Sequence, residues 1–135
     1  MALERTLDAW RSVATWRAGL CAQWGGDPLA EDPQRLESLA CFCAFTGQDP
    51  DALVAFCFLR RRATGERFAS VSRRAELAAK LRACVEGRAL SAAAARQLSA
   101  DVLSFLIHNG VMMNPGFARA TSGAPGSATP ADQPA

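Results

Sequence analysis

Few residues in this sequence of 135 could serve as a nucleophile, a base or a metal ligand. The single histidine, His108, falls at the end of the last expected helix, where the helix dipole favours such a residue. Tyrosine is absent, which excludes reactions with a tyrosine nucleophile. The only acidic cluster, Asp27, Glu31 and Asp32, lies beside a turn and a helix start, where carboxylates commonly cap the main chain. We identify no catalytic residues and expect no enzyme activity and no cofactor, although a pairing of His108 with a cysteine stays open.

Five cysteines all fall in apolar stretches with helical spacing, and they are Cys21, Cys41, Cys43, Cys57 and Cys84. An odd number without a regular framework is typical of buried, free thiols in a reducing compartment. The only close pair has the spacing C-x-C, and residues two apart on a helix point about 200° apart. We therefore expect no metal site. The first residues carry Glu4 and Asp8 without an apolar segment, so we expect no signal peptide and a cytoplasmic protein.

Arginine is the residue type whose distribution indicates a binding chemistry. Of the 15 basic residues 14 are arginine, and the segment 60–88 has a net charge of +6 while residues 1–59 have −4. The planar guanidinium binds phosphate in a bidentate manner, which favours nucleic acid as a partner. The candidate nucleic-acid-binding residues are Arg60, Arg61, Arg62, Arg67, Arg73, Arg74, Lys80 and Arg96.

Two simpler explanations of these arginines stay open. Arginine at the end of a helix is favoured by the helix dipole and can belong to a solvated face. Codon bias can also enrich a chain in arginine. Nucleic-acid binding requires instead that the helices before and after residue 65 pack antiparallel, so that Arg60–Arg62 and Arg73–Arg74 form one patch.

Composition favours helices as the elements that position these residues. The chain has 28 alanines but 6 valines, 1 isoleucine and 6 threonines, and it is 50% hydrophobic and 21% charged. Such a chain can bury the core of one domain. No apolar run approaches 18 residues, so we expect no membrane span.

Capping and periodicity signals predict five helices within an all-α domain over residues 1–115. Helix starts are expected at Asp32-Pro33, Asp49-Pro50, Ser70 or Ser72, and Ser91, and stops at Gly25, Gly47, Thr64-Gly65, Gly87 and Asn109-Gly110. The third helix should run into Arg60–Arg62, which leaves no room for a sheet. Residues 116–135 are rich in Gly, Ala, Ser and Pro, which predicts a disordered tail.

The first helix, expected over residues 3–24, has two overlapping apolar faces. Leu3, Leu7, Trp10, Ala14, Cys21 and Trp24 recur at a spacing of three and four, and Val13, Trp16 and Leu20 widen this stripe. We therefore expect this helix to be buried on more than one side, and the pattern leaves open whether Trp16 faces the core.

Two stretches resemble a known family. Residues 36–53, LESLACFCAFTGQDPDAL, are similar to the early part of the core-binding domain of tyrosine recombinases (phage integrases). Residues 90–115, with a helix that begins at Ser91 and an exit at Asn114-Pro115, resemble the closing helix of that domain. The likeness spans about residues 33–115.

The resemblance implies a SAM-like bundle of four to five helices that clamps DNA. It also implies a stand-alone relative of a mobile-element integrase, since the family's tyrosine-bearing catalytic domain has no counterpart here. The family's closing helix usually presents basic residues to DNA, but residues 91–101 contain only Arg96 and Asp101 as charged residues. Arg96 and Gln97 are therefore the only candidates there for base contacts.

Two functional hypotheses follow. The first is a non-catalytic module that binds duplex DNA. The alternative is a helical protein–protein interaction module without nucleic acid, which the acidic first half, the alanine-lined last helix and the three tryptophans favour.

Overall fold

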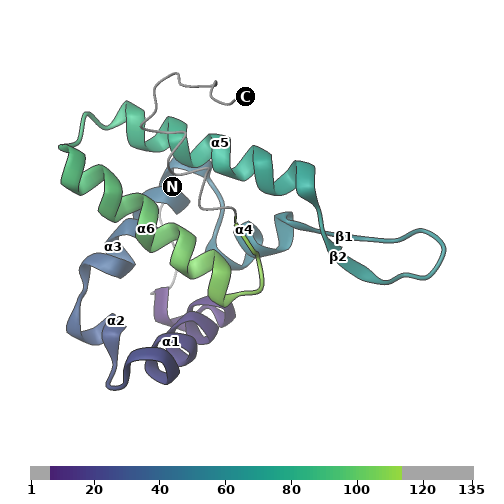
Figure 1. Cartoon of the computed structure of the whole chain (residues 1–135), viewed down its shortest axis with the longest axis horizontal. Coiled ribbons are helices and arrows are strands. Elements are labelled where there is room, and N and C mark those ends of the chain that lie inside the picture. Colours follow the sequence, from purple (N-terminus) through teal and green to yellow (C-terminus); the bar gives the residue numbers. More distant parts are fainter. Residues whose placement is uncertain (1–6, 114–135) are drawn as a thin grey trace, which may run out of the picture.

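The computed structural model describes residues 7–113 and confirms an all-α domain (Figure 1). Its elements are a 3-10 turn (Leu7–Ala9), α1 (Arg11–Trp24), α2 (Pro28–Glu31), α3 (Gln34–Thr46), α4 (Pro50–Phe56), β1 (Phe58–Arg60), β2 (Arg67–Ala69), α5 (Val71–Gly87) and α6 (Ala92–His108). The expected tail, residues 116–135, lies outside the described residues. In residues 7–113 no helix combines the length and apolarity needed to cross a membrane.

Helix α6 crosses the front of the bundle in Figure 1 and packs against three other helices, α1, α3 and α5. One stripe of α6 is buried, formed by Leu98, Val102, Phe105 and Leu106. A helix that contacts neighbours on several sides buries most of its apolar surface. The bundle therefore forms around α6.

The expected burial of α1 is confirmed for only some of its apolar residues. Val13, Trp16 and Leu20 are fully buried, whereas Ala14 and Trp24 are exposed, Trp24 by 69%. The Trp16 ring meets Phe105 of α6 edge to face at 5.5 Å, and this partner decides which stripe turns inward. Helix α1 also begins at Arg11, later than predicted.

The start of α1 is fixed by the main chain of Ser12, a buried residue. Its N–H donates to Oδ1 of Asp51 in α4 at 2.9 Å. Its carbonyl accepts from Nδ2 of Asn109, just after α6, at 3.0 Å. We refer to these two hydrogen bonds as the Ser12 junction, and they hold α1, α4 and the end of α6 together.

Three of the expected N-caps are confirmed. The side chains of Asp49, Ser70 and Ser91 accept hydrogen bonds from the main-chain N–H three residues later, which belong to Ala52, Arg73 and Ala94. Each bond satisfies one of the orphan donors of a first helical turn. The expected stops at Gly47 and Gly110 are also present, with φ of 72° and 85°.

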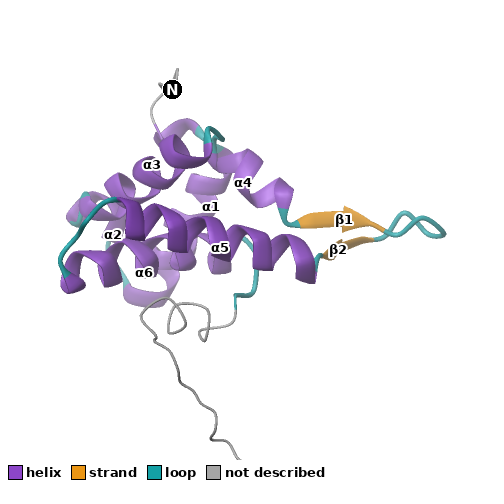
Figure 2. Ribbon diagram, turned by 90° about the horizontal axis from the view of Figure 1, so that it is seen from above, coloured by secondary structure: helices purple, strands orange, loops and turns teal. Residues whose placement is uncertain are grey.

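The prediction that the third helix continues through Arg60–Arg62 is wrong. Helix α4 ends at Phe56, and β1 and β2 form an antiparallel hairpin, with Phe58 opposite Ala69 and Arg60 opposite Arg67. Gly65, at φ 73°, supplies the left-handed residue that the connection between the strands requires. The hairpin projects from the helices into solvent (Figures 1 and 2). A second, smaller correction is α2, which forms where a turn was expected.

The cysteines are free throughout residues 7–113, and Cys43, Cys57 and Cys84 are buried as expected, while Cys21 and Cys41 are half-buried. Burial raises the pKa of Cys43 to about 12 and that of Cys57 to about 11. These two thiols are therefore protonated near neutral pH, a form that neither attacks electrophiles nor binds metals well.

A buried carboxyl group joins α3 to α6. Asp101 is 1% exposed, and its carboxylate accepts hydrogen bonds from Oγ of Ser38 at 2.7 Å and from Nε2 of Gln97 at 2.8 Å. Burial raises the pKa of Asp101, and the two hydrogen bonds partly oppose that effect. The negative charge of Asp101 therefore faces the core of the bundle.

This burial generates a prediction for Asp101→Asn. Because the folded pKa is raised, the folded wild type holds the proton more tightly than the unfolded chain does. Its stability relative to D101N is therefore greatest at acidic pH and declines as the pH rises through the folded pKa. Urea denaturation should show that the free energy of unfolding of D101N, relative to that of the wild type, is higher at about pH 7 than at about pH 4. A difference in the free energy of unfolding between D101N and the wild type that does not change with pH would contradict this. Glu86→Gln, at an exposed site on α5, serves as the control.

Candidate nucleic-acid interface

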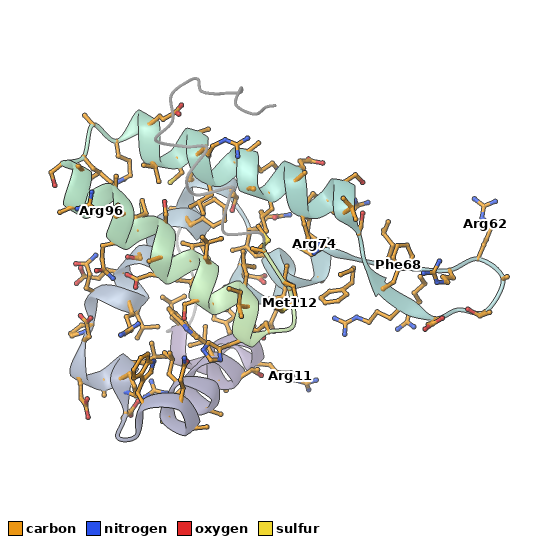
Figure 3. The ribbon with its side chains drawn as sticks, in the orientation of Figure 1. Arg11, Arg62, Phe68, Arg74, Arg96 and Met112 are labelled. Atoms are coloured by element: carbon orange, nitrogen blue, oxygen red, sulfur yellow. The ribbon has the colours of Figure 1, made fainter. Side chains whose placement is uncertain are left out.

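The hairpin, residues 58–69, carries four of the eight predicted site residues, and we call it the arm. Arg60, Arg61, Arg62 and Arg67 are all exposed, and the arm contains one acidic residue, Glu66. Arg62 lies at the tip of the arm, well away from the helices (Figure 3). The patch of arginines expected from two helix ends is therefore built instead by a β-ribbon.

Each face of the arm bears a stacked arginine and phenylalanine. The Arg67 guanidinium lies over the Phe58 ring at 3.7 Å, and that of Arg61 lies over Phe68 at 4.7 Å. The register places both pairs diagonally across the two strands, one pair on each face. These contacts hold the guanidinium groups in place without neutralising them.

The arrangement of charge on the arm is electrostatically unfavourable for the protein alone. Arg60 and Arg67 are directly opposite in the register, and like charges in this position destabilise a strand pair. The one ion pair among the described arm residues joins Arg61 to Glu66 at 3.7 Å. Since α4 ends at Phe56, none of these arginines lies at a helix C-terminus, and the helix-dipole explanation of Arg60–Arg62 does not apply.

The root of the arm is fixed to the bundle. The N–H of Ser70 donates to the carbonyl of Cys57 at 2.8 Å, and both residues are buried. The N–H of Arg61 donates to the carbonyl of Glu66 at 2.8 Å near the tip. The arm is thus tied at its root and near its tip, and residues 60–67 are all exposed.

Arg73 and Arg74 lie beside the root, but their side chains are engaged within the fold. Arg73 Nη1 donates to the carbonyl of Phe56 at 3.1 Å and so caps the C-terminus of α4. Arg74 Nη1 donates to the carbonyl of Met112 at 2.6 Å and its Nε to that of Ser70 at 3.2 Å. Both residues are half-buried, so their hydrogen bonds stabilise the helices that support the arm.

The remaining predicted residues lie away from the arm or are already paired. Lys80 of α5 forms an ion pair with Glu76 at 3.8 Å. Arg96, on α6, lies on the opposite side of the bundle from Arg62 (Figure 3). Gln97, expected as a base reader, donates its amide to Asp101. The structure thus brings four of the predicted residues together and does not bring Arg96 to them.

Sequence reasoning missed the aromatic half of this interface. Phe58 and Phe68 flank the arginines in F-L-R-R-R-A-T-G-E-R-F, where a Thr-Gly pair separates two short strands. The Thr-Gly pair marks the turn, and an aromatic residue at each end favours strands. Phe58 was expected in a helix, because the apolar run before it has helical spacing.

His108 is placed by packing at the end of α6. Its imidazole lies against Gly19 of α1, so closely that a Cβ at this glycine would overlap Nδ1. Gly19 therefore permits the close approach of α1 and α6. No group of three or more His, Cys, Asp or Glu side chains suited to holding a metal ion occurs within residues 7–113.

Comparisons of the chain with protein-family models, with curated proteins and with solved structures found no match.

Replacing an arginine that is hydrogen-bonded within the fold should affect the free energy of unfolding more than replacing an exposed arginine of the arm. Arg74→Ala removes two hydrogen bonds from a charged donor and should lower the free energy of unfolding by about 1–2 kcal/mol. Arg62→Ala, at the solvated tip of the arm, should change it by less than about 0.5 kcal/mol. Chemical denaturation of both variants checks this, and equal effects would contradict the division into supporting and exposed arginines.

Proposed function

We propose that this protein is a non-catalytic DNA-binding module that contacts duplex DNA with the arm. The observation that carries the proposal is the arm itself, a projecting ribbon with four exposed arginines, two of them directly opposite each other. The repulsion between Arg60 and Arg67 falls when both face a polyanion. Phosphates supply that charge and release counterions on binding.

The shape of the arm also supports DNA as the partner. The major groove of B-DNA accepts a two-stranded ribbon, and arginine is the residue that most often contacts guanine there. Arg62 lies at the tip of the arm (Figure 3), so it would enter the groove first, and we expect each of the four exposed arginines to contact a phosphate. Free cysteines agree with a reducing compartment such as the cytoplasm.

The resemblance of residues 33–115 to the core-binding domain of tyrosine recombinases gives separate support. It implies a helical, SAM-like bundle that clamps DNA, and an all-α bundle fits that description. We propose that the chain is a relative of this domain. The arm then takes over the contact that the arginine-poor helix α6 does not provide.

A salt titration with duplex DNA tests the proposal. Four phosphate contacts at about 0.9 each predict a slope of log affinity against log salt of roughly −3 to −4. We expect weak binding, near micromolar at physiological salt, with little sequence preference. Absence of binding at low salt, where screening is least, would overturn the proposal.

A paired substitution locates the contact. Arg61→Ala with Arg62→Ala should flatten the slope by about 1.8 and weaken binding to all sequences alike. Arg88→Ala is the matched control. Arg88 directly follows the 17-residue helix α5, so it lies about 26 Å from the end of that helix that adjoins the arm. Should the wild type bind polyglutamate but no duplex, the arginines would belong to an interface with an acidic protein, the alternative function.

A further inference from the structure

The arm does not end at a flat surface, because a trough leads from it across the bundle. One hollow at the root of the arm is lined by Ala55, Phe58, Leu59, Arg60 and Arg67. A larger open hollow of about 560 Å³ adjoins it and extends to Arg11, Thr15 and His108. The two hollows share Ala55 and Arg67 in their lining, and we refer to the two together as the trough.

Arg11 lies at the far end of this trough. It is exposed, and within residues 7–113 its guanidinium forms no ion pair or hydrogen bond. Its side chain extends from α1 toward the side of the bundle from which the arm projects (Figure 3). Arg11 lies in the acidic half of the sequence, and folding brings it into one trough with Arg67.

The position of Arg11 is unfavourable for the bundle alone. It is the first residue of α1, where the positive end of the helix dipole repels a cation. The carboxylate in the trough, Asp51, accepts the N–H of Ser12 and thus serves as the cap of α1. Arg11, Arg60 and Arg67 therefore give the trough a positive charge that nothing in its own lining fully balances.

We propose that the trough holds the sugar–phosphate backbone of the DNA bound by the arm, with a phosphate between Arg67 and Arg11. This inference rests on the proposed function and adds a second contact site to it. Thr15 and Ala55 also line the larger hollow, and the Thr15 side chain has a hydroxyl that can donate to a phosphate. The arm and the trough together form a clamp, with Arg67 belonging to both.

Two substitutions test the trough independently. Arg11→Ala should flatten the salt slope by about 0.9 and weaken duplex binding roughly three- to tenfold at low salt. Ala55→Glu should weaken binding more strongly, because it places a carboxylate at an exposed helix position in the middle of the trough. Their matched controls are Arg88→Ala and Ala83→Glu, which make the same changes at exposed positions of or next to the far half of α5.

The outcomes separate this inference from the proposed function. Loss of affinity in R11A and A55E, with both controls unchanged and the helical circular dichroism intact, supports the trough. Unchanged affinity in either R11A or A55E, while the arm variant R61A/R62A binds weakly, overturns the trough and leaves the arm as the contact. Unchanged affinity in the arm variant, or no binding by the wild type, overturns both.

Discussion

The two hydrogen bonds to the main chain of Ser12 set the geometry on which the rest of the molecule depends. Asp51 accepts a hydrogen bond from the N–H of Ser12, and Asn109 donates one to its carbonyl. The single buried residue Ser12 therefore joins α4 and the end of α6 to the start of α1. Helix α4 leads directly into the arm. The Ser12 junction therefore fixes where the arm projects relative to α1, and it brings Arg11 and Arg67 into the lining of one hollow.

The arm and the bundle are stabilised by different physics. The bundle excludes water from a core centred on α6, where Trp16 and Phe105 meet. A two-stranded hairpin has no such core and is marginal in isolation. Here its two arginine–phenylalanine stacks, each worth about 0.5–1 kcal/mol at an exposed site, replace the missing core. The residues that order the arm are thus the same ones that present its charge.

Local signals in the sequence were enough to predict most helices, and tertiary contacts decide what they missed. Asp49, Ser70 and Ser91 act as caps within their own turns, so their role is visible in the sequence. The face of α1 that packs on the core could not be fixed from the sequence, because two apolar stripes overlap and the buried Trp16 packs on Phe105 of α6, far away in the sequence. Likewise, nothing near Arg11 in the sequence indicates that it lines the same hollow as Arg67. Of the candidate interface, the arginines of the arm were foreseen, but their strands and aromatic partners were not.

The closure of the arm at its root has a consequence for how such a module can change. The Ser70 N–H reaches the Cys57 carbonyl, so the two chain ends that enter and leave the arm are neighbours inside the bundle. Residues 58–69 are therefore an insertion between adjacent points, and a short turn could replace them without moving a helix. Ribbons of other lengths and sequences could replace residues 58–69 on the same helical scaffold. The sequence of the arm can therefore change during evolution without a change in the contacts that stabilise the bundle.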